Sequence, residues 1–258
     1  MKLNVPEGVD AGEFELLPTG AGAYEATSVL CLHGLSGTPY EVRPVAERLA
    51  ERGFRCRGPV MAGHARSARE LARTSHEAWL DLARSEAEAL RRDSDRVFVV
   101  GLSMGGLVSL ELAAAGLVDG VAVIGTPLRF SAALRWAVPL AKYVYPYMSK
   151  KNGSDIQEDE ARARHPGLPA IPLASVHQLI RLQRKVERSL PGISVPILAA
   201  HGALDRTANP KDAKEILAEV NSLERELHIC ERSGHVATVD HDGAELALRV
   251  TEFFERLP

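Results

Sequence analysis

The pentapeptide Gly101-Leu102-Ser103-Met104-Gly105 has the form Gly-x-Ser-x-Gly. A serine hydroxyl can attack a carbonyl carbon when a neighbouring base takes its proton. The apolar residues 97–100 predict a strand before the pentapeptide, and helical spacing begins at Met104. This order predicts a strained turn that presents Ser103 at the positive end of a helix. The alternative is an ordinary turn in which Ser103 only caps the helix.

The base that serves Ser103 is expected to be His235. It follows a predicted strand at 226–230, in Ser233-Gly234-His235-Val236, and residues that follow parallel strands gather at one edge of a sheet. The competing histidines are His33, His64, His201, His228 and His241. Of these, His33 and His201 are interpreted as turn-packing residues, His228 as a strand residue and His241 as the start of a helix.

An acid is then needed to hold the imidazole in the correct tautomer and to stabilise its cation. Asp205 directly follows a predicted strand at 196–200. Its rivals are Asp212, which lies in a predicted helix, and Asp240, which is placed to cap one. The order serine, aspartate, histidine along the chain is the one expected when the nucleophile occupies a strand-turn-helix. An Asx turn ahead of Pro210 is the alternative interpretation of Asp205.

Attack on a carbonyl also requires hydrogen-bond donors for the negatively charged oxygen that forms. The backbone N–H of Met104, directly after the nucleophile, is predicted to be one donor. The loop His33-Gly34-Leu35-Ser36-Gly37 follows another predicted strand, and its glycines allow the backbone to approach a substrate. The N–H of Leu35 is therefore predicted to be the second donor.

The segments that position these residues alternate between strands and helices. Short β-branched runs predict strands at 28–32, 54–60, 97–100, 118–124, 196–200 and 226–230. Apolar residues spaced by three and four predict helices at 41–52, 77–91, 104–115, 210–220 and 243–256. Such alternation predicts an α/β domain, with a mainly parallel sheet covered by helices on both faces.

The alternation is interrupted once, between residues 126 and 195. About seventy residues is too long for a plain crossover, so residues 127–190 are predicted to form a helical cap inserted into a core made of residues 1–126 and 191–258. A long crossover helix with loose flanks is the alternative. Apolar cap residues either line an acyl pocket or pack the cap on its domain: Trp136, Val138, Leu140, Tyr143 and Tyr147.

Composition excludes several classes of function for this 258-residue chain. The net charge is −3 and the basic residues are scattered, which argues against a nucleic-acid partner. No run approaches the roughly 20 apolar residues of a membrane span, and the N-terminus lacks the apolar run of a secretory signal. The three widely spaced cysteines fit buried thiols in a reducing cytoplasm: Cys31, Cys56 and Cys230. Neither a metal nor a cofactor is expected, and monomer and homodimer both remain open.

The motifs together resemble the bacterial carboxylesterase and monoacylglycerol lipase group of the α/β-hydrolase superfamily. The matching pieces run in order along nearly the whole chain: Leu32 to Thr38, Gly63-His64, Gly101 to Gly106, His201 to Asp205 and Ser233 to Val236. The resemblance implies an α/β-hydrolase fold with a small helical cap inserted after the sixth strand. It also implies Ser103, Asp205 and His235 as the catalytic triad, with N–H groups of Leu35 and Met104 binding the oxyanion. The chain departs from the usual pattern at Ala65, where a glycine commonly follows Gly63-His64.

The expected activity is hydrolysis of a small-molecule carboxylic ester through an acyl-enzyme, with short to medium acyl chains or monoacylglycerols as substrates. Two alternatives stay open. The same triad can cleave a carbon-carbon bond of a dicarbonyl compound or a peptide bond. The fold can also serve as a ligand receptor without catalysis, although such a role needs no coherent triad.

Overall fold

The central element of the fold is a mainly parallel sheet. The computed structural model describes residues 1–19, 24, 26–64, 66–150 and 153–257, and within these residues seven strands pair in the order β1-β3-β2-β4-β5-β8-β9. Only β1 runs antiparallel to its neighbour among these seven. The strands are β1 Phe14–Leu16, β2 Thr27–Leu32, β3 Arg55–Gly58, β4 Arg96–Leu102, β5 Gly120–Ile124, β8 Ile197–Gly202 and β9 Arg225–Cys230. The predicted α/β class is therefore confirmed.

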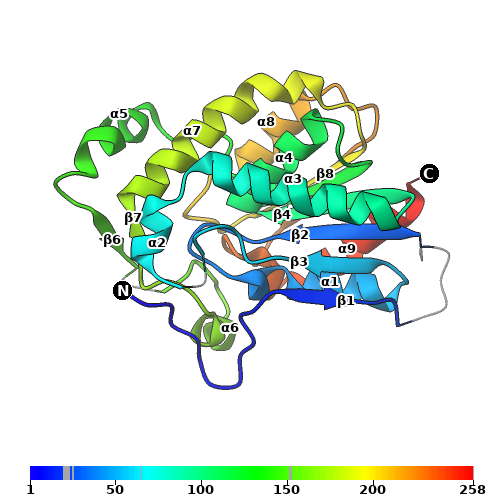
Figure 1. Ribbon diagram of the computed structural model, residues 1–258, viewed down its shortest axis with the longest axis horizontal. Helices are drawn as coiled ribbons and strands as arrows, with labels where there is room; N and C mark the ends of the chain where they lie inside the picture. The colour runs from blue at the N-terminus through cyan, green and yellow to red at the C-terminus, as the bar shows by residue number, and fades with distance from the viewer. Residues whose placement is uncertain (20–23, 25, 65, 151–152, 258) are drawn as a thin grey trace.

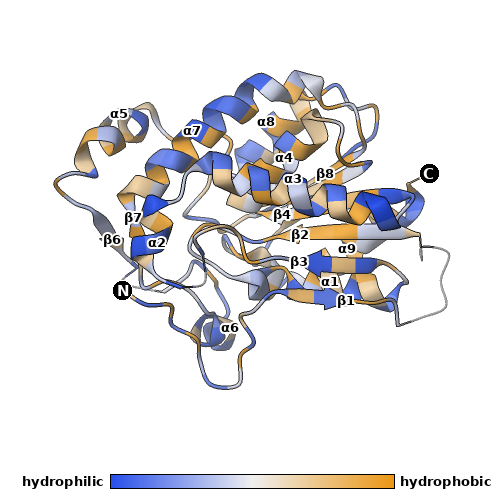
Figure 2. Ribbon diagram, in the orientation of Figure 1, coloured by the Kyte–Doolittle hydropathy of each residue, from blue (hydrophilic) through white to orange (hydrophobic). Residues whose placement is uncertain are grey.

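Helices cover both faces of the sheet (Figure 1). Side chains alternate along β4, so that Val97 and Val99 pack in one apolar cluster while Phe98 and Val100 pack in the other. The first cluster lies under α3 (His76–Asp93), α4 (Met104–Ala114), α7 (Leu173–Ser189) and α8 (Lys211–Glu219), and the second under α1 (Arg43–Glu51) and α9 (Gly243–Arg256). Strands β2 and β4 are mostly apolar, whereas β1 and β3 and the outer helices carry both polar and apolar residues (Figure 2), as expected for a sheet whose centre is buried on both faces.

The segment between β5 and β8 contains α5 (Ala132–Ala141), β6 (Tyr147–Ser149), α6 (Asp159–Arg164), β7 (Ala170–Pro172) and α7. It follows the fifth strand of the described chain, not the sixth, because only the short β1 precedes β2. Strands β6 and β7 pair with each other, and with α5 they extend beyond one end of the main sheet (Figure 1). Helix α7 differs from them, since Leu182 and Val186 belong to the buried core. A separate cap at 127–190 stays a prediction.

Shorter elements complete the described chain. They are α2 (Ala68–Arg73) and the 3-10 helices η1 (Pro39–Glu41), η2 (Leu190–Gly192) and η3 (Ala237–Val239). Near the N-terminus, Lys2 bridges to Ser67 and Asn4 to Gly167, which ties this end of the chain to the loop before α2 and the loop after α6. Ala65, where the sequence departs from the family pattern, lies outside the described residues. Across the part of the chain that is described, the helices are too short or too polar to cross a membrane.

Candidate active site

The nucleophile turn is formed where β4 ends and α4 begins. Ser103, between them, has φ 54° and ψ −113°, a backbone conformation that L-residues seldom adopt. A Cβ atom on Gly101 would lie 2.3 Å from the carbonyl oxygen of Gly105, and a Cβ atom on Gly105 would lie 2.1 Å from that of Leu32. Both glycines of Gly-x-Ser-x-Gly are therefore required by the close approach of helix and strands.

A continuous hydrogen-bonded chain joins Ser103 to His235 and Asp205. Nε2 of His235 lies 2.9 Å from Oγ of Ser103, and Nδ1 of the same ring lies 2.8 Å from Oδ2 of Asp205. The three residues follow β4, β9 and β8 respectively, so the carboxyl ends of three parallel strands bring them together. This arrangement can move a proton from the serine hydroxyl to the imidazole while the carboxylate stabilises the resulting cation.

Burial and hydrogen bonding shift the titration of His235 and Asp205 in opposite directions. Burial alone would lower the pKa of His235, but the hydrogen bond and charge of Asp205 outweigh it, so that the pKa lies above its ordinary value. Burial alone would raise the pKa of Asp205, but hydrogen bonds from His201 and His235 hold that pKa well below its usual range. Asp205 is thus ionised at neutral pH, and His235 is a stronger base than a free imidazole.

Two backbone N–H groups near Ser103 are free to bind an oxyanion. Among the described residues, the N–H groups of Leu35 and Met104 donate to no other backbone group, whereas the N–H of Gly37 bonds to the carbonyl of Gly34. A Cβ atom on Gly34 would lie 3.4 Å from Cβ of Ser103, so the loop passes directly beside the nucleophile. The loop between β2 and η1 can therefore supply the donor that the sequence predicts.

Comparison with known proteins identifies the family of this chain. A sequence model of the family described as serine aminopeptidase, S33 (Hydrolase_4) matches residues 25–242. The chain belongs to this α/β-hydrolase family.

Relatives of this α/β-hydrolase include the thermostable monoacylglycerol lipase of Bacillus sp. (strain H-257), which is 30% identical over 233 residues that cover 88% of this chain and 90% of the relative. The carboxylesterase of Bacillus subtilis (strain 168) is 28% identical over 231 residues, covering 89% of this chain and 93% of the relative. A solved structure described under "LipS and LipT, two metagenome-derived lipolytic enzymes" has a TM-score of 0.88 at 25% identity, covering 98% of this chain and 100% of the other. The predicted resemblance is confirmed at this level.

His201 contacts the candidate catalytic acid, a contact that was not predicted from the sequence. Its Nε2 lies 2.8 Å from Oδ2 of Asp205, the same oxygen that Nδ1 of His235 approaches. The other oxygen, Oδ1, accepts the N–H groups of Thr207 at 2.7 Å and Ala208 at 2.8 Å. The interpretation of His201 as only a turn-packing residue was therefore wrong. The sequence shows only a histidine four residues before the acid at the end of a strand, a spacing that does not by itself reveal this contact.

Removing the His201 donor should change the pH profile of catalysis. We expect His201→Leu to lower kcat/KM about 10-fold, since one hydrogen bond to a charged group is worth about 1.5–3 kcal/mol. Without the hydrogen bond from His201, the carboxylate of Asp205 would interact more strongly with His235 and raise the pKa of His235 further. The rising limb of the kcat/KM profile would then move to higher pH. His201→Gln, which keeps an N–H donor, should lie between the two. His228→Leu, a histidine on β9, is the control, and coincident profiles for His201→Leu and wild type would contradict the expectation.

The remaining histidines lie away from the proton path or have structural partners. Nε2 of His33 accepts the N–H of Met61 at 3.1 Å, and its Nδ1 lies 2.9 Å from the carbonyl oxygen of Gly34, so this ring supports the oxyanion loop. Burial, with a contribution from His33, lowers the pKa of His64 to about 3. His64 is thus neutral at working pH and lies with its ring centroid 5.0 Å from that of His33.

Asp240 joins the stretch before α6 to the loop of His235. Its carboxylate accepts N–H groups of Gln157 at 2.7 Å, Glu158 at 2.9 Å and Gly234 at 2.8 Å. Asp155 does the same for the loop of Asp205, since it accepts the N–H of Arg206 at 2.7 Å. The stretch 155–158, directly before α6, is therefore attached to the loops that carry Asp205 and His235. The carboxylate of Asp240 binds these backbone groups and makes no hydrogen bond with His235 among the described residues.

Asp212, the other rival acid, binds a backbone group away from His235. Its Oδ2 accepts the N–H of Leu128 at 2.9 Å, and burial raises its pKa to about 6 from an ordinary 3.8. Because the folded value exceeds the unfolded one, the stability that this group contributes is complete below pH 3.8 and is lost as pH rises through about 6. Ionisation of Asp212 therefore destabilises the fold at neutral pH.

The substitution Asp212→Asn removes this ionisation while keeping an oxygen to accept the N–H of Leu128. We expect the variant to melt at a higher temperature than wild type at pH 8 and at a similar temperature at pH 4.5, measured by thermal unfolding at both pH values. Asp81→Asn, at a side chain that is 72% exposed, should leave both melting temperatures unchanged. A lower melting temperature for Asp212→Asn at pH 8 would show that the charge itself is stabilising.

The apolar residues of the predicted cap differ in burial. Val138 is buried against Val176 and Ile180 of α7, which itself lies within the predicted cap. The other four are exposed, at 80% for Trp136, 75% for Leu140, 79% for Tyr143 and 41% for Tyr147. Neither an enclosed acyl pocket nor cap packing accounts for these four, because α5 and β6 extend beyond the core (Figure 1).

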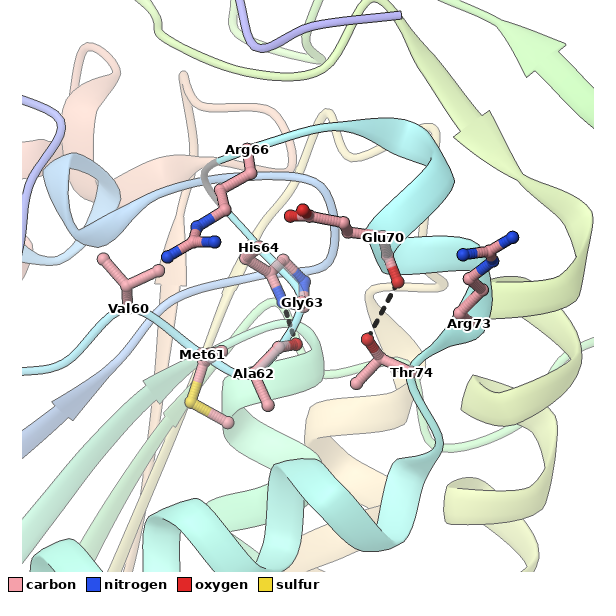
Figure 3. A pocket seen from close by; sticks show the side chains of 9 residues that line it. All are labelled: Val60, Met61, Ala62, Gly63, His64, Arg66, Glu70, Arg73 and Thr74. Carbon is pink, nitrogen blue, oxygen red and sulfur yellow. Dashed lines mark hydrogen bonds between the residues drawn. The ribbon is translucent and has the colours of Figure 1, made fainter.

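A pocket of about 490 Å³ lies in the loop after β3 and beside α2 (Figure 3). No triad residue lines it, and the Nε2 atom of His64 has no hydrogen-bond partner among the described residues. Its lining is formed by Val60, Met61, Ala62, Gly63, His64, Arg66, Glu70, Arg73 and Thr74. Across the described residues, no three His, Cys, Asp or Glu side chains are grouped as metal ligands.

Proposed function

We propose that this protein is a serine carboxylesterase that hydrolyses carboxylic esters through an acyl-enzyme. The observation that carries the proposal is the hydrogen-bonded chain from Ser103 through His235 to Asp205, beside two unused N–H groups. The names of the two relatives, a monoacylglycerol lipase and a carboxylesterase, support the choice of an ester bond.

The reaction follows from the placement of these groups. Oγ of Ser103 attacks the carbonyl carbon while its proton passes to Nε2 of His235, and the carbonyl oxygen becomes an anion held by the N–H groups of Leu35 and Met104. The carbon-oxygen bond to the alcohol then breaks, and His235 returns the proton to the leaving alcohol. Water repeats the sequence on the acyl-enzyme, releasing the acid and restoring Ser103.

The proposed substrates are monoacylglycerols or esters with short to medium acyl chains. The exposed apolar side chains on α5 and β6 support this class, since they offer a surface for an acyl chain or a lipid-like substrate. We also propose a cytoplasmic location, because the three cysteines are free and buried.

A peptide substrate is the second candidate, because the matching family is described as a serine aminopeptidase. The triad geometry serves either bond, since acyl transfer from an ester and from an amide use the same steps. The two candidates are separated by the leaving group that the enzyme accepts.

The test treats the protein with an alkyl phosphonate and locates the adduct by peptide mass spectrometry, then compares nitrophenyl esters of increasing acyl length with aminoacyl nitroanilides and a dicarbonyl substrate. We expect a single adduct on Ser103 and turnover of the esters. Turnover of nitroanilides or the dicarbonyl compound without ester turnover would overturn the ester assignment. Tight ester binding with neither turnover nor adduct would indicate a receptor.

A further inference from the structure

Glu41, at the end of η1, lies beneath the loop that carries the Leu35 N–H. Its side chain is buried, and Oε2 accepts the N–H of Gly34 at 2.8 Å. A Cβ atom on Gly37 would lie 2.1 Å from Oε1 of Glu41, so the loop closes tightly around this carboxylate. Glu41 therefore contacts the loop on both sides of Leu35.

The second oxygen of Glu41 reaches a residue far along the chain. Oε1 lies 3.0 Å from Nε2 of His165, which follows α6, and Nδ1 of His165 lies 3.0 Å from Oγ of Ser154. The side chains of Glu41 and His165 are 6% and 2% exposed. Ser154 and His165 both belong to the segment between β5 and β8, so a buried polar chain runs from that segment to the backbone of the oxyanion loop.

A backbone contact runs parallel to this chain. The N–H of Leu168 donates to the carbonyl oxygen of Ser36 at 3.1 Å. Ser36 has φ 64°, a left-handed conformation that a serine holds only when its surroundings impose it. Glu41 therefore holds Gly34 and the loop at 165–168 holds Ser36, so that both neighbours of Leu35 are fixed.

The charge of Glu41 strengthens this hold. Burial alone would raise the pKa of Glu41, but the hydrogen bond and charge of His165, with smaller contributions from His33 and the N–H of Gly34, lower it to about 2. Among the surrounding titratable groups, Lys150 also responds to this carboxylate: burial lowers the pKa of the lysine, and the charge of Glu41 acts in the opposite direction. Hydrogen bonds to an ionised carboxylate are about twice as strong as neutral ones, so the N–H of Gly34 is firmly fixed.

We propose that Glu41 and His165 are a positioning pair that fixes the oxyanion loop and makes the direction of the Leu35 N–H depend on the segment between β5 and β8. Neither residue touches the substrate. Because the oxyanion exists only after attack on the carbonyl, loss of the pair lowers kcat and leaves KM nearly unchanged. The inference rests on the proposed ester hydrolysis.

The test measures kcat and KM for a nitrophenyl ester, and the rate of phosphonate reaction, in Glu41→Ala, Glu41→Gln and His165→Ala. Each kcat is divided by the concentration of Ser103 that a phosphonate can label, so that unfolded protein does not count. We expect kcat to fall about 10²-fold in Glu41→Ala, as for loss of one oxyanion donor, with KM within about threefold. Glu41→Gln keeps an oxygen for the N–H of Gly34 and should recover most of the loss, and His165→Ala should lose about 10-fold.

Glu111→Ala is the matched control, since Glu111 is also a buried carboxylate with one partner, Lys185 at 2.9 Å, and lies outside this site. It should lower the melting temperature and keep kcat within about threefold. An equal loss of kcat in Glu111→Ala, or wild-type kcat in His165→Ala, would overturn the positioning pair even if Glu41→Ala fails to fold. A wild-type protein that neither labels at Ser103 nor hydrolyses esters would instead overturn the proposed function, and the pair with it.

Discussion

Replacing Ser103 with alanine should lower kcat for ester hydrolysis by about 10⁵-fold or more, with KM changed little. The loss is expected to be this large because, in the proposed mechanism, the hydroxyl forms the acyl-enzyme, and without it only the oxyanion donors and substrate binding remain. The measurement is single-turnover hydrolysis of a nitrophenyl ester, together with phosphonate labelling, which should disappear.

Ser109→Ala is the control for this experiment. Ser109 is a buried serine on the same helix whose hydroxyl donates only to the carbonyl of Gly105, at 2.8 Å, so its loss should leave kcat within about threefold. Ser103→Gly should be as inactive as Ser103→Ala but should melt at a higher temperature, since glycine accepts φ 54° without the steric cost that alanine keeps. Full activity in either Ser103 variant would remove the residue from the mechanism.

Replacing Asp205 with asparagine should lower kcat by about 10⁴-fold while the fold persists. The N–H groups of Thr207 and Ala208 both point at Oδ1, so the amide oxygen must take that place. The amide NH₂ then faces His235 in place of Oδ2, and Nδ1 of the ring can only accept from it. The neutral ring of His235 then carries its proton on Nε2, the nitrogen that faces Ser103. With this nitrogen protonated, the ring cannot accept the proton of the serine hydroxyl.

The measurement for Asp205→Asn is kcat at several pH values with a thermal melt on the same sample. Asp212→Asn serves as the comparison, because Asp212 was the rival acid and contacts Leu128 instead. A kcat within 10-fold of wild type for Asp205→Asn would contradict the assigned role of Asp205. A loss of the predicted size with an unchanged melting profile would separate the tautomer effect from misfolding.

The parts of the site that local sequence determines were predictable. Ser103, Asp205 and His235 each follow a strand, and parallel strands deliver their following residues to the same edge, so the pattern of apolar runs was enough to place them together. The glycines around Ser103 are needed for close backbone contacts, which leaves a readable motif. The sheet was predicted for the same reason, apart from β1, whose three residues are too few to show a period of two.

The parts that depend on side-chain direction and distant partners were not predictable. Nothing in the sequence shows that His201 turns toward Asp205, since a histidine before a glycine fits many turns. Glu41 and His165 are separated by 124 residues, and neither stands in a motif. Helix α7 falls within the predicted cap because the distance between the strands is long, and the sequence did not show that its Leu182 and Val186 share the buried core with α4.

The attachment of residues 155–168, which include α6, matters for protein engineering. Asp155 and the N–H groups bound by Asp240 tie this stretch to both triad loops, and His165 ties it to the oxyanion loop. Helix α5 and strand β6 contact α7 and β7, and among the described residues they make no hydrogen bond to the loops of Ser103, Asp205, His235 or Leu35. A chimera that imports only α5 and β6 from a relative should therefore exchange selectivity while leaving the reaction intact, whereas a graft that extends to residue 168 would replace part of the catalytic framework itself.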